Sequence, residues 1–153
     1  MSHRRLPPVV FALALIAQHL FPFGAAAQKD SPPGASATAC PKAADVKQPH
    51  MLGLWRAEFE GQPAGATVLL EKNANYADSF SGQINRNGER AKVAGDVEDG
   101  EFTLEESADG VRITATWTGD VVEGSCGREI RGTWQASREK RASPFVLRKL
   151  AGP

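Results

Sequence analysis

The sequence predicts an all-β protein, specifically an eight-stranded antiparallel up-and-down meander barrel, and three observations favour this fold class. Short segments of alternating apolar and polar residues follow one another from residue 52 to residue 150 at nearly even spacing. Turn signals separate them, most clearly Asp99-Gly100 and Asp109-Gly110, because Asp-Gly suits hairpin turns that require positive φ at both central residues. No long segment has the 3.6-residue apolar period of a helix. A sandwich of two four-stranded sheets is the alternative.

The strands can be placed in chain order from this alternation. They are expected over residues 52–60, 66–71, 79–85 and 91–97, then on either side of Asp109-Gly110, and finally over 129–136 and 144–150. Eight strands are enough to close a meander and remove its unpaired edges. The residues expected to face inward are Trp55, Phe59, Val68, Leu70, Phe80, Ile84, Val93, Phe102, Leu104, Ile113, Trp117, Ile130, Trp134, Phe145 and Leu147.

The register of the central stretch, residues 93–117, follows from its two Asp-Gly pairs if each forms a two-residue turn. The first turn then places Val97 opposite Phe102. The second places Phe102 opposite Trp117 and Leu104 opposite Ala115. Since directly opposite residues share a face of the sheet, both turns give the same apolar face.

The chain is expected to divide into three parts. Residues 1–27 have a cationic start, an apolar core and a small-residue cleavage site at Ala25-Ala26-Ala27, which together predict a signal peptide and a secreted or periplasmic protein with no membrane span after cleavage. Residues 28–50 are poor in bulky apolar residues and are expected to form a flexible leader. Residues 51–153 are expected to form the barrel.

The two cysteines, Cys40 and Cys126, most simply form a disulfide in an exported protein. Such a bond would tether the leader to the barrel. The sequence Ala37-Thr38-Ala39-Cys40 also has a weak match to a lipoprotein cleavage box, so lipidation of Cys40 is the alternative.

Composition narrows the classes of function. Without Arg4 and Arg5 of the signal, 16 Lys and Arg stand against 18 Asp and Glu, and this balance argues against a nucleic-acid binder. His50 is the single histidine left after cleavage, and a hydrolase triad or a transition-metal site needs more suitable residues than this. We therefore expect that the protein is not an enzyme and that it has no metal site and no cofactor.

Two Gly-x-Trp motifs carry a resemblance. Gly53-Leu54-Trp55 opens the first expected strand, and Gly132-Thr133-Trp134 lies near the end of the chain. This resembles the start of calycin-type barrels such as lipocalins and avidins, over roughly residues 52–150. The resemblance implies a closed barrel that binds a small ligand in its mouth, with the first Trp packed near a basic residue of the last strand. Arg148 is the candidate, although alternation with Phe145 and Leu147 directs its side chain outward.

The leading functional hypothesis is a non-enzymatic binder of a small, mostly apolar ligand at the barrel mouth. Aromatic residues on the inward face often line such pockets, but they also fill the interior of small barrels. Glu106 would lie opposite Ile113 in the expected register, where it either orients a ligand or lies in water at the rim of a longer turn. The expected ligand-binding residues are Trp55, Phe102, Glu106, Trp117 and Trp134.

The second hypothesis is a protein-binding module or an inhibitor, and it rests on the distribution of charge. Seven acids and no base lie between Lys92 and Arg112, whereas the segment from Arg128 to Lys149, both ends included, contains seven bases and two acids. In an eight-stranded meander these segments lie on opposite sides, so an acidic side could bind a cationic protein such as a lysozyme or a protease. The expected partner-binding residues are Asp96, Glu98, Glu101 and Glu105. A structural role in the cell envelope is a further alternative.

Overall fold

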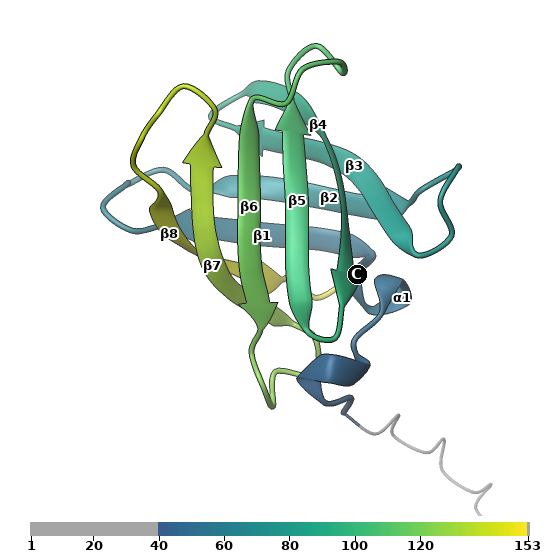
Figure 1. The fold of residues 1–153 in the computed structure, drawn as a ribbon. Helices are drawn as coiled ribbons and strands as arrows, with labels where there is room; N and C mark the ends of the chain where they lie inside the picture. The colour runs from purple at the N-terminus through teal and green to yellow at the C-terminus, as the bar shows by residue number, and fades with distance from the viewer. Residues whose placement is uncertain (1–39, 153) are drawn as a thin grey trace, which may run out of the picture. The chain divides into compact units, whose positions relative to one another are not determined.

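A computed structural model describes residues 40–152, and these form the predicted barrel (Figure 1). The expected signal peptide and the first part of the expected leader, residues 28–39, lie outside the described residues. The strands are β1 (Gly53–Phe59), β2 (Ala66–Lys72), β3 (Ser79–Arg86), β4 (Glu89–Glu98), β5 (Glu101–Ser107), β6 (Ala115–Val121), β7 (Glu129–Ala136) and β8 (Ser143–Lys149). Each strand pairs with the next, and β8 pairs with β1 to close the barrel. This closure excludes the two-sheet sandwich.

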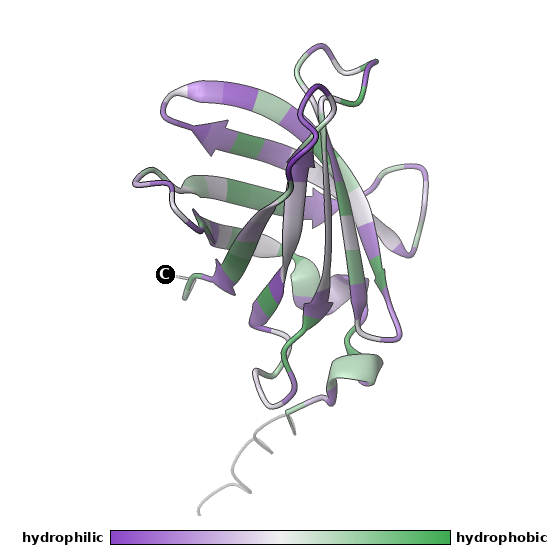
Figure 2. Ribbon diagram, turned by 60° about the vertical axis from the view of Figure 1, so that its left-hand side comes forward, coloured by the Kyte–Doolittle hydropathy of each residue, from purple (hydrophilic) through white to green (hydrophobic). Residues whose placement is uncertain are grey.

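The alternation predicted from the sequence decides which side chains fill the interior. Figure 2 shows apolar and polar residues alternating along the strands, and every strand contributes at least one buried apolar side chain to the interior. The tightest aromatic contacts join Phe59, Trp117 and Phe145, with ring centroids 5.2 Å and 4.7 Å apart. Phe80 and Phe102 stack at 5.9 Å elsewhere in the core. The centre of the barrel is therefore packed with side chains.

The predicted β4–β5 hairpin is confirmed. Val97 lies opposite Phe102, and the turn residues Asp99 and Gly100 have φ values of +49° and +87°, as this type of two-residue turn requires. At the end of β3, Asn87 and Gly88 form a similar turn with φ values of +55° and +92°.

The predicted register of the β5–β6 hairpin is wrong by two residues. Leu104 lies opposite Trp117, and Glu106 lies opposite Ala115, because residues 108–114 form a loop instead of a two-residue turn. A shift of two residues keeps every side chain on its predicted face, so the apolar face survives with different partners. Ile113, predicted to face inward, lies in this loop and is 47% exposed.

The segment before β1 differs from the flexible leader expected for residues 28–50. Residues 40–52, which we call the strap, contain a short 3-10 helix (Ala43–Asp45) and helix α1 (Gln48–Met51), and Val46 and Met51 are completely buried. A disulfide joins Cys40 to Cys126, which excludes lipidation of Cys40 in this structure. The strap orders itself because it buries these two side chains at one end of the barrel and is covalently attached there.

The strap also explains the environment of Trp55. The Trp55 indole Nε1–H donates a hydrogen bond to the Met51 carbonyl at 2.7 Å. Lys149 Nζ lies 5.7 Å from the centre of the Trp55 ring, and it donates a hydrogen bond to the His50 carbonyl at 2.6 Å. Arg148 points outward and does not contact Trp55. The basic residue beside Trp55 is thus Lys149 and not Arg148, the candidate expected from the sequence.

Candidate functional site

A buried charge pair lies at the end of the barrel opposite the strap, which we call the mouth. Glu106, near the end of β5, is 4% exposed and receives two hydrogen bonds from Arg86, the last residue of β3: Nη2 donates to Oε1 at 3.0 Å and Nη1 to Oε2 at 3.5 Å. The Arg86 side chain is 28% exposed. A buried carboxylate needs such compensation, because an isolated buried charge is strongly unfavourable.

Aromatic residues complete the mouth. The indole N–H groups of Trp117 and Trp134 both donate to Glu106 Oε1 at 2.8 Å. The Arg86 guanidinium carbon lies 5.1 Å from the centre of the Phe59 ring and 4.9 Å from the Trp134 ring, within the range of cation–π attraction. Among residues 40–152, every buried side-chain nitrogen or oxygen has a hydrogen-bond partner. The mouth is therefore a fully satisfied polar cluster with aromatic walls.

The structure brings together three of the five expected ligand-binding residues. Glu106, Trp117 and Trp134 meet at the mouth, while Trp55 lies beside the strap and Phe102 stacks on Phe80. The β5–β6 connection is longer than two residues, as one of the two expectations for Glu106 required. The exposure to water expected with that longer turn is wrong, because the carboxylate is buried and paired with Arg86. The sequence did carry a signal for the missed residue Arg86: it shares the inward alternation of Phe80 and Ile84 on β3.

The four expected partner-binding carboxylates lie together on the outer surface of β4 and β5. Asp96, Glu98, Glu101 and Glu105 are all exposed, and Asp120 on β6 joins them. We call these five residues the acidic face. Glu98 lies opposite Glu101, which in turn lies opposite Asp120, and directly opposed like charges destabilise a sheet.

The acidic face has little internal compensation. Within the described part of the chain, none of its five carboxylates lies within ion-pair distance of a base; Asp96 accepts a hydrogen bond from the Thr103 hydroxyl at 2.9 Å. The acidic row ends at Arg131, which is opposite Asp120 in the register but pairs with Glu129 at 2.7 Å. The negative charges thus remain available to a partner.

Open hollows follow the acidic face. One of about 460 Å³ is lined by Asp96 and Glu105 together with the exposed ring of Tyr76. A second hollow, of about 630 Å³, is lined by Asp96, Glu98 and two lysines. A third hollow, of about 420 Å³, is lined by Glu101 and Asp120. These hollows lie on the outside of the barrel, beside the acidic face.

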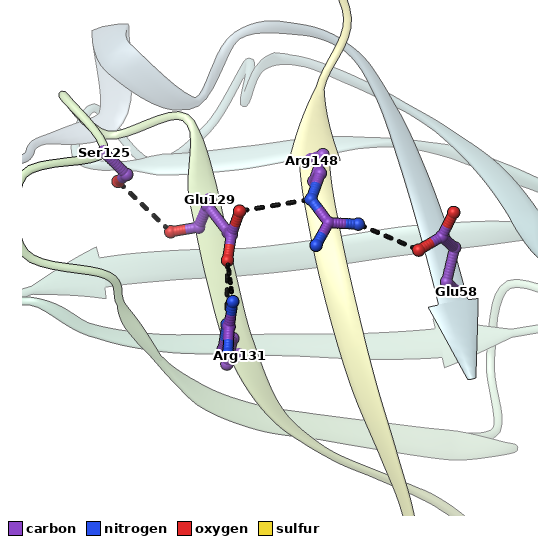
Figure 3. Close-up of polar contacts among 5 residues, drawn as sticks. All are labelled: Glu58, Ser125, Glu129, Arg131 and Arg148. Atoms are coloured by element: carbon purple, nitrogen blue, oxygen red, sulfur yellow. Dashed lines mark hydrogen bonds and ion pairs between the residues drawn. The ribbon is translucent and has the colours of Figure 1, made fainter. Parts of the chain in front are cut away.

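On β7, β8 and β1, beyond the acidic face, two arginines are paired with glutamates. Figure 3 shows Arg148 of β8 between Glu58 of β1 and Glu129 of β7, while Glu129 also binds Arg131. The N–O distances are 2.8 Å for Arg148–Glu58 and 3.1 Å for Arg148–Glu129. Hydrogen bonding to Arg131, then to Arg148, holds the pKa of Glu129 below its ordinary value, and hydrogen bonding to Glu129 raises the pKa of Arg148.

The remaining groups among residues 40–152 that could support chemistry have structural roles or lie apart from one another. His50 Nδ1 accepts the backbone N–H of Lys47 at 2.9 Å and so serves helix α1. No group of three or more His, Cys, Asp or Glu in this range is arranged to hold a metal ion. No helix in the same range has the length and apolarity needed to cross a bilayer.

The fold and the two sites define a class of protein: a closed, eight-stranded, up-and-down antiparallel β-barrel with a disulfide-attached strap, a polar cluster in its mouth and an acidic outer face. Comparison with protein-family models and with curated protein sequences gives no match to this chain.

Proposed function

We propose that this chain is an exported, non-enzymatic binding protein that uses its acidic face to hold a cationic protein. One observation carries the proposal: Glu98, Glu101 and Asp120 form a cross-strand row of carboxylates with no ion-pair partner in the described structure. Such a row costs stability in the free protein, and a cationic partner would relieve that cost.

Two further features support this function. Two of the seven bases from Arg128 to Lys149, namely Arg131 and Arg148, are paired with glutamates, whereas no carboxylate of the acidic face has an ion-pair partner among the described residues. The Cys40–Cys126 disulfide suits a protein that works outside the reducing cytosol. Complementary charge of this kind increases association rates and selects partners by sign.

The small apolar ligand expected at the mouth receives less support. Trp55, Phe102 and Trp117 are at most 1% exposed and pack into the core, so they offer little surface to a ligand. The mouth itself is occupied by the Arg86–Glu106 pair.

Charge-neutralising variants test the proposed function. The quadruple variant D96N/E98Q/E101Q/E105Q removes four negative charges from the acidic face, and E60Q/E71Q/E89Q/E139Q removes four from exposed positions outside it. Each protein is immobilised and exposed to an extract of the source cell's exported proteins at about 0.01 M and about 0.15 M salt, where the Debye length falls from about 30 Å to about 8 Å.

We expect one or a few basic proteins to be retained by the wild type and by the control variant, more strongly at low salt, and to be lost from the acidic-face variant. The retained proteins are then identified and their affinity measured with purified components. Equal retention by both quadruple variants would contradict the proposed function, as would retention that does not depend on salt.

A further inference from the structure

The carboxylate in the mouth is held in place independently of Arg86. Glu106 extends from β5, and the two indole N–H groups that bind its Oε1 come from β6 and β7, the next two strands. If the Arg86 side chain moved away, these two donors would still fix the position of the carboxylate. They would not neutralise its charge, and a nearby cation stabilises an ionised carboxylate buried at this position.

Arg86 approaches the same carboxylate from a different part of the barrel. It ends β3 immediately before the two-residue turn Asn87-Gly88, and its side chain is the partly exposed member of the pair. Its guanidinium lies against the rings of both Phe59 and Trp134, which also contact each other. Removing this one side chain would leave a recess that opens outward, with aromatic walls and a carboxylate at its base.

Such a recess has the chemistry of an organic-cation site. A planar guanidinium stacks on aromatic faces and forms paired hydrogen bonds with a carboxylate, and Arg86 already makes both kinds of contact here. Phe59 and Trp134 lie 5.7 Å apart in an edge-to-face arrangement, and Phe59 also contacts Trp117, so the walls support one another without the arginine.

We propose that the mouth is a guanidinium-binding site in which Arg86 is the built-in occupant, and that the guanidinium group of a ligand can displace it. The site uses inward-facing residues, so it is independent of the acidic face. Because a tethered group acts at an effective concentration in the millimolar range, Arg86 lowers the apparent affinity of the site for a free ligand and limits occupation to high ligand concentrations.

Titration with methylguanidinium chloride, followed by tryptophan fluorescence, tests the proposed displacement in the wild-type protein. Sodium chloride at equal concentration is the control for ionic strength. Free arginine and a short peptide with one internal arginine are titrated in the same way to compare a small-molecule source of the guanidinium with a protein source. We expect a saturable change with methylguanidinium and with at least one of these two ligands.

Variants then connect the response to the mouth. R86A should lower the half-saturating concentration of methylguanidinium by about tenfold or more, because the tethered competitor is removed. R86M, which keeps the apolar part of the side chain, should do the same and replaces R86A if R86A does not fold. R90A, which removes an exposed arginine from the same hairpin, should behave like the wild type, and R86M/E106Q should lose the saturable response.

Three results would overturn the inference. One is the absence of a saturable response in the wild type. This result counts against the inference even if R86A or R86M binds methylguanidinium, because Arg86 would then be a permanent structural part of the mouth that no ligand displaces. Another is an unchanged half-saturating concentration in both Arg86 variants. The last is a full response in R86M/E106Q, which would place the binding site elsewhere.

Discussion

Glu106 and Arg86 form a charge pair whose members do not stabilise the fold independently. Removing one member of a buried pair leaves the other charge uncompensated, which costs about 3–5 kcal/mol for full burial. Since the Arg86 side chain is 28% exposed, we expect a smaller loss, about 1–3 kcal/mol, for E106Q or R86M alone. The double variant R86M/E106Q should be less destabilised than the sum of the two single variants.

Urea unfolding of the four proteins measures this coupling, and we expect an interaction free energy of at least about 1 kcal/mol. The exposed pair Glu58–Arg148 provides a matched control cycle, E58Q and R148M, because solvent screens it. Its coupling should be smaller than that of the mouth pair. Simple additivity at the mouth would show that Glu106 and Arg86 do not depend on each other.

Glu129 provides a pH-dependent prediction at the same scale. Hydrogen bonding to Arg131 contributes most to its lowered pKa. The folded pKa of Glu129 lies below the ordinary value of 4.5, so the stabilisation from this carboxylate is complete above that value and is lost as the pH falls through the folded pKa.

R131A should raise the pKa of Glu129, as measured by NMR titration of its carboxyl carbon. R138A, which removes an exposed arginine from the β7–β8 loop, should leave it unchanged; equal shifts in both variants would contradict the assigned cause.

At the scale of elements, Asp109 organises the loop between β5 and β6. Its Oδ1 accepts the backbone N–H groups of Val111 and Arg112, each at 2.8 Å, and the Ser107 hydroxyl at 3.2 Å. D109A should therefore speed hydrogen exchange at the Val111 and Arg112 amides, while D120A, which removes an exposed charge from β6, should not. Unchanged exchange in D109A would show that the loop is ordered by other contacts.

The same carboxylate sets the pH response of this loop. Backbone hydrogen bonds, that to Arg112 first and then that to Val111, lower the pKa of Asp109 below its ordinary value of 3.8. The hydrogen bonds should persist above that value and weaken as the pH falls through the folded pKa. NMR shifts of the two amides should follow one titration with a midpoint below 3.8, and a higher midpoint would contradict this account.

The two Asp-Gly pairs show how far local sequence predicts an element. At Asp99-Gly100 the preference for positive φ leads directly to the observed turn. At Asp109-Gly110 the aspartate instead binds amides two and three residues ahead, a role that Asp also favours. The dipeptide cannot distinguish the two outcomes. The strand alternation is therefore predictable, whereas the length of this connection is not.

The residues of the mouth show that prediction of a site from local sequence has the same limit. Alternation along β5 and β3 places Glu106 and Arg86 on the inner side, and this much can be read from the sequence. Their side chains meet across β4, which pairs with both strands, and no short-range pattern encodes the curvature of the sheet that brings them together. The acidic face, by contrast, could be predicted because its residues lie on adjacent hairpin strands.

At the scale of the whole barrel, the two ends are closed in different ways. The strap closes one end with buried apolar side chains and a covalent bond, while the mouth is closed by the charged side chain of Arg86, the last residue of β3. Apolar burial resists water more strongly than a partly exposed ion pair does. Any exchange with small molecules should therefore take place at the mouth.

The disulfide should add stability without determining the fold. All eight strand pairings involve residues 53–149 and do not require the strap. The Cys40–Cys126 bond has a sequence separation of 86 residues, for which the chain-entropy model gives about 4 kcal/mol as an upper value. C40S/C126S should unfold at lower urea concentration yet keep its β circular dichroism, and the reduced wild type should behave like it. Loss of the β signal in native buffer would contradict this expectation.

Whether the strap stays docked without the disulfide can be decided with Met51. Its buried side chain, the Trp55 hydrogen bond to its carbonyl and the Gln48 side-chain contact with Ser79 all hold the strap without help from Cys40. M51A should therefore cost about 2–5 kcal/mol in the wild type and a similar amount in C40S/C126S, since the two effects are independent if the strap stays docked. If the loss from M51A disappears in the serine background, the disulfide is what keeps the strap on the barrel.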